Sequence, residues 1–232
     1  MVYVLCSLLI AALAILAGCQ PKEDKVIAIT FDDGPNVTTT VKMLDMLEKH
    51  GVIASFFVNG MNINEESAKV MKRAYDMGCD IENHSFSHPA MSGLSEEEII
   101  KEVESTSALI EKYTGEAPQF FRPPYIDCNQ RMMDIIPLTF ICGHGCEDWL
   151  PQVSAQERAQ RQIDAAVDGR IMLLHDMPGN ESTVEALDIM IPELKKQGYR
   201  FVTISELFKL KNEPLTPHSG IMYSVVPEYQ QQ

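Results

Sequence analysis

The sequence predicts one α/β domain built on a parallel sheet or barrel, and two patterns indicate this. Short runs of strand length alternate along the chain with longer stretches whose apolar residues recur at helical spacing. The polar motifs that could perform chemistry follow the strand candidates directly, as they do where functional side chains lie at the carboxyl ends of parallel strands. The 232 residues suffice for one sizeable domain, and no internal repeat interrupts the alternation.

About seven strands are expected. The first, at 26–29, is wholly apolar, and the turn residues Gly34 and Pro35 follow shortly after it. The strand at 171–174 is also apolar and leads directly to His175. The remaining strand candidates cover residues 54–58, 79–83, 120–122, 138–142 and 199–204.

Helices are expected between these strands. A glycine follows three of the helical stretches, and glycine commonly ends helices. Two others begin with a serine that precedes a glutamate by three residues, which is the capping-box pattern of a helix start. In order, the expected helices cover residues 39–50, 64–77, 95–113, 154–167, 182–197 and 205–210.

The first 18 residues have no charged side chain, and residues 5–16 are almost wholly apolar. The tetrapeptide LAGC at 16–19 resembles the lipobox of bacterial lipoprotein signal peptides, which implies cleavage before Cys19 and a lipid on its sulfur. An ordinary signal peptide or an uncleaved anchor is the alternative. The expected organisation is a lipoprotein signal peptide at 1–18, a linker at 19–25, one domain at 26–210 and a loosely packed, irregular tail at 211–232.

The charge of the chain argues against two classes of partner. All charged residues follow residue 18, so the exported part keeps the net charge of −14. A chain this acidic is poorly suited to bind nucleic acid or an anionic lipid surface. Contact with the bacterial cell membrane is therefore expected only through the lipid anchor, with the domain facing the exterior.

The exported part contains the four cysteines Cys79, Cys128, Cys142 and Cys146. An oxidising compartment permits disulfides, and four cysteines allow three pairings. The last two are spaced like metal ligands, but no second cysteine pair accompanies them. Buried thiols or a single disulfide are the expected states.

Asp32 and Asp33 stand together after the first expected strand and directly before Gly34 and Pro35. Adjacent side chains at a strand end diverge, so the two carboxylates can take different roles. Solvated acids of a surface turn are the alternative. An apolar strand that runs into both acids makes a buried, functional pair the better interpretation.

His84 and His88 are four residues apart, and on a compact loop this spacing brings two imidazoles to one side. Pro89 favours such a loop over a long helix. Two histidines and one carboxylate form a ligand set that leaves positions open for water and substrate. Such a histidine pair is usually structural when it stands alone, but here it follows the paired aspartates.

Three more side chains are candidates for the same site. Arg122 follows two phenylalanines and precedes two prolines, which would fix its direction. His175 is either a hydrogen-bonded core residue or an acid with a tuned pKa. Trp149, the only tryptophan, is either a core residue or an aromatic platform beside a sugar groove.

Five short motifs occur in a fixed order: TFDDGP (30–35), HSFSH (84–88), RPPY (122–125), DW (148–149) and LLH (173–175). Together they resemble the motifs of the polysaccharide deacetylase family, carbohydrate esterase family 4, over about residues 26–210. The resemblance implies a distorted (β/α) barrel of seven or eight parallel strands and a divalent metal, commonly zinc or cobalt. It also implies removal of acetyl groups from a polysaccharide, either O-acetyl groups of a xylan-like polymer or N-acetyl groups of a peptidoglycan or chitin type of glycan.

The resemblance implies a role for each matching residue. The implied metal ligands are Asp33, His84 and His88. The implied catalytic residues are the general base Asp32, its partner Arg122 and the general acid His175. The implied substrate contacts are Leu173 in the acetyl pocket, the backbone N–H of Tyr125 at the oxyanion, and Trp149.

Two positions depart from the family pattern. Gly145 stands where the family commonly has an aspartate that supports the catalytic histidine, and Ile126 stands where a glycine often follows the third motif. The sequence leaves open whether Glu147 or Asp148 replaces the missing carboxylate. His175 is therefore expected to be a loosely oriented acid, which serves an ester substrate better than an amide.

The sequence predicts a monomeric, lipid-anchored, metal-dependent polysaccharide deacetylase. The stretch 140–149 resembles the FICGxGCxDW pattern of acetylxylan-esterase-like members of the family, which favours O-acetyl groups. A catalytically weak, carbohydrate-binding lipoprotein with the same fold is the alternative, and Gly145 is its only support. A serine esterase is excluded because the chain has no Gly-x-Ser-x-Gly motif.

Overall fold

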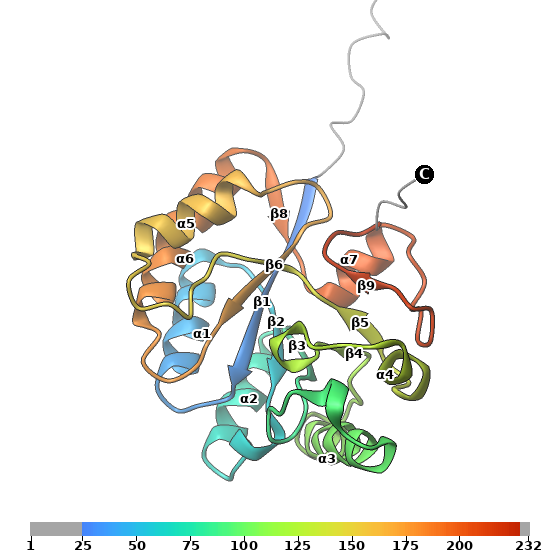
Figure 1. The fold of residues 1–232 in the computed structure, drawn as a ribbon. Coiled ribbons are helices and arrows are strands. Elements are labelled where there is room, and N and C mark those ends of the chain that lie inside the picture. Colours follow the sequence, from blue (N-terminus) through green and yellow to red (C-terminus); the bar gives the residue numbers. More distant parts are fainter. Residues whose placement is uncertain (1–24, 228–232) are drawn as a thin grey trace, which may run out of the picture.

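The computed structural model describes residues 25–227. They form one curved sheet of parallel strands, and most of the helices are arranged around its outside (Figure 1). The strand order is β6-β7-β1-β2-β3-β4-β5-β9, and β8 pairs with β1. The predicted α/β class and the (β/α) barrel with parallel strands are confirmed.

The longest strand, β1 (Lys25–Gly34), lies in the middle of the sheet. β2 (Ser55–Val58) pairs with one edge of it. Two strands share the other edge: β8 (Tyr199–Phe201) pairs with the start of β1, and β7 (Ile171–His175) pairs with its end. The first and fifth motifs of the sequence therefore end side by side, with Asp32 and His175 in register.

Side chains of β1 alternate between two cores because successive strand residues point to opposite faces. One core lies between the sheet and the helices and takes up Ile27, Ile29 and Phe31. The other core includes Val26 and Ala28 together with Phe57 and Phe120. Continuation of this alternation places Asp32 on the same face as Val26 and Ala28, which is the inner face of the curved sheet.

The remaining strands are short. They are β3 (Asp80–Asn83), β4 (Phe120–Phe121), β5 (Thr139–Ile141), β6 (His144–Gly145) and β9 (Met222–Tyr223). The sequence predicts the first three within one or two residues. β6 and β9 have two residues each, which is too short for a periodic sequence signal, and neither is predicted.

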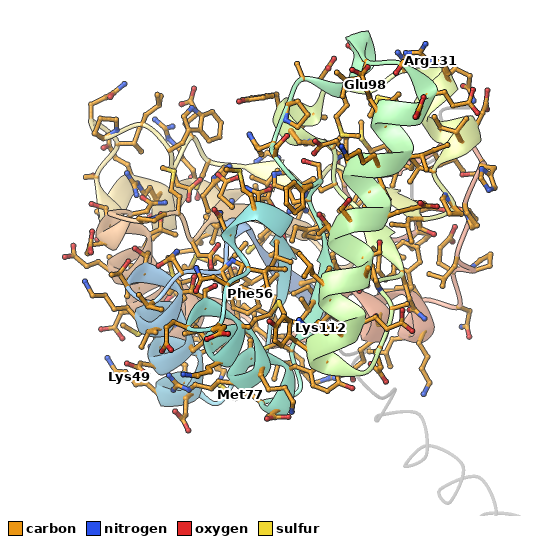
Figure 2. The ribbon with its side chains drawn as sticks, turned by 90° about the horizontal axis from the view of Figure 1, so that it is seen from below. Lys49, Phe56, Met77, Glu98, Lys112 and Arg131 are labelled. Carbon is orange, nitrogen blue, oxygen red and sulfur yellow. The ribbon has the colours of Figure 1, made fainter. Side chains whose placement is uncertain are left out.

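The helices are α1 (Thr39–His50), α2 (Ser67–Asp76), α3 (Glu96–Thr114), α4 (Gln130–Ile135), α5 (Ala155–Asp164), α6 (Glu181–Lys196) and α7 (Ile204–Leu210). Both predicted capping boxes are present, at the starts of α3 and α5. Figure 2 looks onto α1, α2 and α3, and Glu98 and Lys112 lie towards opposite ends of α3. Only α4 is missing from the sequence prediction.

The segment after α7 packs against the sheet, so the expectation of a loose tail at 211–232 is wrong for its described part. β9 pairs with β5, and Tyr223 and Val226 are fully buried. The backbone oxygen of Tyr223 accepts hydrogen bonds from the amides of Cys142 and Gly143, and the following carbonyl accepts one from β7. This segment therefore bridges β5 and β7 and closes the curve of the sheet.

Within residues 25–227, no helix is both long and apolar enough to span a membrane. The expected signal peptide at 1–18 and the expected lipidation at Cys19 lie outside the described residues.

Candidate active site

The paired aspartates lie at the irregular end of β1 and differ in burial and backbone conformation. Asp32 is almost fully buried. Asp33 has a positive φ of 77°, and the pairing of β1 with β2 shifts register between Asp32 and Gly34. This bulge gives Asp33 a backbone conformation unlike that of a regular strand. Oδ2 of Asp32 and Oδ1 of Asp33 lie 3.8 and 3.6 Å from the same atom, Nε2 of His84. That the two acids take different roles stays a prediction.

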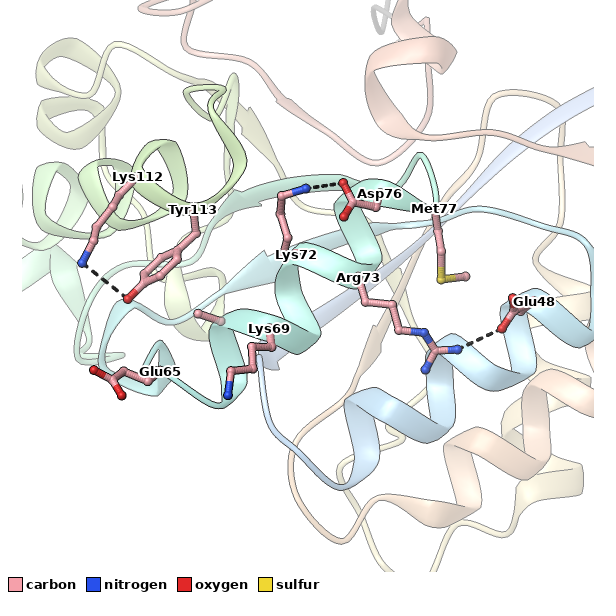
Figure 3. A pocket seen from close by; sticks show the side chains of 10 residues that line it. Glu48, Glu65, Lys69, Lys72, Arg73, Asp76, Met77, Lys112 and Tyr113 are labelled. Atoms are coloured by element: carbon pink, nitrogen blue, oxygen red, sulfur yellow. Dashed lines mark hydrogen bonds and ion pairs between the residues drawn. The ribbon is translucent and has the colours of Figure 1, made fainter.

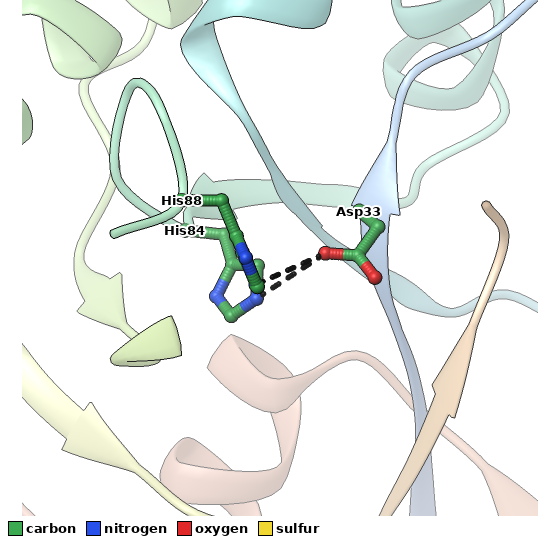
Figure 4. Close-up of side chains that lie close together, drawn as sticks. All are labelled: Asp33, His84 and His88. Carbon is green, nitrogen blue, oxygen red and sulfur yellow. Dashed lines mark ion pairs between the residues drawn. The ribbon is translucent and has the colours of Figure 1, made fainter. Parts of the chain in front are cut away.

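Asp33 meets the two histidines of the second motif (Figure 4). Its Oδ1 lies 3.6 Å from Nε2 of His84 and 3.3 Å from Nε2 of His88. One ligand atom from each of the three residues lies within 4.8 Å of the others. Two imidazole nitrogens and one carboxylate oxygen suit a borderline-soft divalent cation and leave coordination positions open. The three predicted ligands therefore come together and fit a divalent metal.

A further contact fixes the protonation of His84. Its Nδ1 lies 2.7 Å from the backbone oxygen of Arg122, which can only accept, so Nδ1 carries the hydrogen. Burial lowers the pKa of His84 to about 3, although the charge of Asp33 opposes this shift. The ring is therefore neutral, and its Nε2 lone pair is available as a ligand.

The loop from His84 to His88 is held by Glu102 on α3, a residue that the sequence analysis does not identify. Glu102 accepts hydrogen bonds from the backbone N–H groups of Phe86 and Ser87 at 2.8 and 2.7 Å, and from the Ser87 hydroxyl at 2.7 Å. Two residues of the loop have positive φ values, which side chains disfavour, and these bonds offset that cost. Glu102 is one of several glutamates along α3, so its sequence context does not distinguish it.

Arg122 holds Asp32 from within the sheet. Its Nη1 donates to Oδ1 of Asp32 at 2.5 Å and to the hydroxyl of Thr30 at 2.8 Å. The guanidinium is fully buried and lies over the ring of Phe57, 4.2 Å from its centroid. Burial raises the pKa of Asp32, and the charge and hydrogen bond of Arg122 oppose this shift. The predicted pairing of Arg122 with Asp32 is confirmed.

His175, at the end of β7, is held by Asp148. Its Nδ1 lies 2.7 Å from Oδ1 of Asp148, and its backbone N–H donates to Oδ2 at 2.8 Å. Burial disfavours the imidazolium form, but Asp148 outweighs this effect together with the charges of Asp32 and Asp33. They raise the pKa of His175 to about 9, so the ring is protonated at neutral pH.

The expectation that His175 is loosely oriented is therefore wrong. Asp148 supplies the carboxylate that the family pattern places at Gly145. Glu147, the other candidate, lies at the surface and pairs with Arg161 at 2.5 Å. A Cβ atom at Gly145 would lie 3.7 Å from the ring of Trp149, so the glycine leaves space beside that ring.

The predicted ligands, the base, the acid and the substrate contacts line one cavity of about 580 Å³. Arg122 is not part of the lining and supports it from below. Tyr125 is 71% exposed and its ring meets that of His88, with centroids 4.6 Å apart. Trp149 is 47% exposed and meets His175 with centroids 5.4 Å apart. The exposure of Trp149 excludes the core interpretation.

A larger hollow of about 880 Å³ lies elsewhere, beside α2 and the end of α3 (Figure 3). Four of its charged side chains form ion pairs with each other: Lys72 with Asp76, and Arg73 with Glu48. It contains none of the predicted catalytic or metal-binding residues. The chemistry therefore assigns the active site to the smaller cavity.

The four described cysteines are free thiols, so the disulfide alternative is not observed. Cys79 and Cys146 are buried, and burial raises their pKa values to about 11 and about 12. Such thiols remain protonated and unreactive. Within residues 25–227, no cysteine belongs to a cluster that could hold a metal.

The sequence model of a family described as polysaccharide deacetylase matches residues 20–137, about half of the chain. The chain belongs to the polysaccharide deacetylase family. This family uses a divalent metal, and the cluster of Asp33, His84 and His88 is the group in this deacetylase domain that fits one.

The names of related proteins indicate that members of this family act on more than one polymer. A bifunctional xylanase/deacetylase of Pseudobutyrivibrio xylanivorans is 44% identical over 195 residues, which are 84% of this chain and 32% of that protein. A peptidoglycan-N-acetylmuramic acid deacetylase of Bacillus subtilis is 36% identical over 200 residues, which are 83% of this chain and 42% of that protein. The chain therefore spans less than half the length of these two relatives.

Solved structures resemble most of this chain. A family 4 acetyl xylan esterase from Clostridium thermocellum, in complex with a cobalt ion, superposes with a TM-score of 0.86 at 42% identity. The similarity covers 88% of this chain and 100% of that one. It therefore extends beyond the 20–137 match to the part of the chain that contains Asp148 and His175.

Proposed function

We propose that this protein removes acetyl groups from a polysaccharide by metal-dependent hydrolysis. One observation supports the proposal above all. A cluster of two histidines and a carboxylate shares a cavity with a buried carboxylate held by an arginine and with a histidine held by a second carboxylate. A cation site, a base and an acid are the groups that hydrolysis of an acetyl ester or amide requires.

One pair of residues activates the attacking water, and a second pair protonates the leaving group. A divalent cation on the three ligands would polarise the acetyl carbonyl and lower the pKa of water. Asp32 takes the proton of the attacking water while Arg122 keeps its carboxylate in place. His175 then donates a proton to the leaving oxygen or nitrogen, and Asp148 stabilises the imidazolium that makes this possible.

Three residues of the cavity would contact the substrate. We assign the backbone N–H of Tyr125 as a donor to the oxyanion, and one such donor contributes about 3 kcal/mol to the transition state. Leu173 is nearly buried in the cavity wall and would contact the acetyl methyl group. Trp149 is exposed at the cavity and offers an apolar face to a sugar ring.

We infer that O-acetyl groups of a xylan-like polymer are the preferred substrate. The xylanase/deacetylase and the acetyl xylan esterase share 44% and 42% identity with this chain, against 36% for the peptidoglycan deacetylase. The argument from a loosely oriented acid no longer supports this preference, because Asp148 holds His175. The preference therefore rests on the relatives and on the sequence pattern at 140–149.

Acetate release from three polymers tests the function and its substrate. We expect kcat/KM on acetylxylan to exceed the values on chitooligosaccharides and on peptidoglycan. A higher kcat/KM on either N-acetylated glycan would reverse the substrate assignment. No acetate release from any of the three would contradict the proposed function.

Removal of the metal should abolish activity. We expect a chelator to stop acetate release and added Zn²⁺ or Co²⁺ to restore it, because no other described cluster could replace the three ligands. The control is the same chelator loaded with metal beforehand, which should not inhibit. Full activity of protein shown by elemental analysis to be metal-free would disprove the metal mechanism.

The alternative of a weak, carbohydrate-binding lipoprotein loses its only support. It depended on Gly145, which left His175 without a supporting carboxylate in the sequence. Asp148 supplies that carboxylate at 2.7 Å. With base, acid and ligand cluster all present in one cavity, a catalytic function is the better assignment.

We also propose that Cys19 bears a lipid that anchors the protein to the outer surface of a bacterial cell membrane. The uncharged, apolar residues before LAGC at 16–19 support this proposal. We expect radiolabelled palmitate to be incorporated in a bacterial host and Cys19→Ser to abolish the label. Cys6→Ser, a change of the same kind in the same leader, should keep it; label that persists in Cys19→Ser would rule out the anchor.

A further inference from the structure

Arg158 on α5 is a buried cation that forms no direct ion pair with a described carboxylate. Its Nε donates to the backbone oxygen of Val153 at 2.8 Å, and its Nη2 donates to that of Leu150 at 3.0 Å. Its Nη1 donates to the side-chain oxygens of Asn180 at 2.6 Å and Thr183 at 2.9 Å. A buried charge is costly unless hydrogen bonds satisfy it, and here every nitrogen of the guanidinium has a partner.

Both side chains that Arg158 contacts also contact Asp148. The hydroxyl of Thr183 lies 2.9 Å from Oδ2 of Asp148, and Nδ2 of Asn180 lies 3.2 Å from the same oxygen. The amide of Asn180 also donates to the backbone oxygen of His175 at 2.8 Å. Thr183 and Asn180 therefore each form a hydrogen-bonded bridge between Arg158 and Asp148.

In both bridges the hydrogen bonds are donated in the same direction, from Arg158 towards Asp148. A guanidinium can only donate hydrogen bonds, and an ionised carboxylate can only accept them. Thr183 therefore accepts from Arg158 and gives its one hydroxyl hydrogen to Asp148. Asn180 turns its oxygen towards Arg158, which leaves its NH₂ group for Asp148. Both bridges stabilise Asp148 as an anion.

We propose that Arg158 is a positioning residue for the acid His175 and that it acts through Thr183, Asn180 and Asp148. This inference rests on the proposed function of His175. The donors of the two bridges, together with the backbone N–H of His175, hold Oδ2 of Asp148, so that Oδ1 meets Nδ1 of the imidazole. A fixed and ionised Asp148 in turn keeps His175 protonated and aligned for proton transfer.

Other charges also face His175, and only one of them is linked to Arg158. Asp148 contacts the imidazole directly, while Asp32 and Asp33 act on it through space from the end of β1. Arg122 is paired with Asp32. A change at Arg158 should therefore alter His175 through Asp148 and leave the base and the metal ligands as they are.

Two variants and a matched control test this inference. Arg158→Gln removes the cation, and Thr183→Val removes one bridge with little change of shape. Arg161→Gln is the control, because Arg161 lies on the same helix but is 42% exposed and bonds only to Glu147 and the backbone of Cys146. Circular dichroism and bound metal are measured on all four proteins to confirm the fold.

Two substrates separate a loss of the acid from a general loss of structure. An acetylated xylo-oligosaccharide releases an alkoxide that needs a proton, whereas 4-nitrophenyl acetate releases a phenolate that does not. We expect kcat on the sugar to fall roughly tenfold or more in both variants, the scale of supporting residues. We expect KM and the amount of bound metal to stay unchanged, and the turnover of 4-nitrophenyl acetate to stay near that of the wild type. The alkaline limb of the pH profile of kcat on the sugar should move to lower pH.

The result that would overturn the inference is a folded Thr183→Val or Arg158→Gln variant with wild-type kcat and pH profile on the sugar. An equal loss on both substrates would overturn it as well. Should Arg158→Gln not fold, Thr183→Val decides alone. A wild-type protein that does not hydrolyse the acetylated xylo-oligosaccharide would contradict the inferred preference for O-acetyl groups. The titration of His175, followed by NMR, then decides the inference about Arg158, and an unchanged pKa of His175 in both variants rejects it.

Discussion

Replacing Asp33 by alanine should abolish metal binding, whereas replacing Asp32 by asparagine should keep the metal and lower kcat by roughly 10²-fold or more. The two adjacent carboxylates differ in their surroundings. Asp33 Oδ1 lies within 3.6 Å of a nitrogen of both His84 and His88. Oδ1 of Asp32 is taken by Arg122, which leaves Oδ2 to accept a proton in the cavity.

Metal content by elemental analysis and kcat on one acetylated substrate are the two measurements. Asp32→Asn preserves the shape and the hydrogen bond to Arg122, so a loss of turnover in a folded, metal-loaded variant reports the missing base. Asp45→Asn is the control, since Asp45 is an exposed partner of Arg73 far from the cavity. Equal metal loss in Asp32→Asn and Asp33→Ala would contradict the division of roles.

Local sequence signals predicted the elements that are long enough to have a period or a cap. The helix at 39–50 is observed with the same bounds, and Gly51 ends it in the left-handed conformation. Ser95 and Ser154 form the predicted capping boxes. These features depend on residues within one helical turn of each other, so the sequence alone suffices to predict them.

The two-residue strands β6 and β9, whose positions depend on distant residues, are not predicted. β9 has two residues and no period, and its position depends on hydrogen bonds to β5, about 80 residues earlier in the chain. The buried Tyr223 and Val226 follow a stretch rich in polar residues and prolines, which suggested a loose tail. Tertiary contacts order this segment, and no local propensity indicates them.

In the candidate site, too, residues that belong to short motifs could be predicted from the sequence, whereas contacts between distant residues could not. The family resemblance implies Asp33, His84 and His88 as metal ligands, and their motifs follow strands of one parallel sheet, whose ends meet. The expectation of a loosely oriented His175 is wrong because the family pattern places the supporting carboxylate four residues before Trp149, at Gly145, whereas Asp148 supplies it. Asp148 contacts His175 across 27 residues of sequence, and only the folded chain shows which acid is in reach. Glu102, Thr183 and Asn180 are polar residues without a motif, so their contacts also required the structure.

Replacing Asp148 by asparagine should lower kcat on an acetylated sugar by roughly 10²- to 10⁴-fold, the range of general acid catalysis. Oδ2 of Asp148 accepts from the backbone N–H of His175, the hydroxyl of Thr183 and the amide of Asn180, and Oδ1 faces Nδ1 of His175. Asparagine has one oxygen and one NH₂ group. In one orientation its NH₂ group would face the three donors that now bond to Oδ2, and in the other it would face Nδ1 of His175. Both orientations remove the negative charge and the hydrogen bonding that stabilise the imidazolium.

The pH profile should change in a known direction in Asp148→Asn. His175 can donate a proton only while it is protonated, which holds below its pKa. Burial lowers the pKa of His175, but Asp148 together with the charges of Asp32 and Asp33 raises it to about 9 from an ordinary 6.5. Neutralising Asp148 should therefore lower the pKa of His175 and move the alkaline limb of kcat to lower pH. Glu147→Gln, one residue earlier and at the surface, should leave the limb in place. An Asp148→Asn variant with bound metal and an unshifted limb would show that a group other than His175 donates the proton.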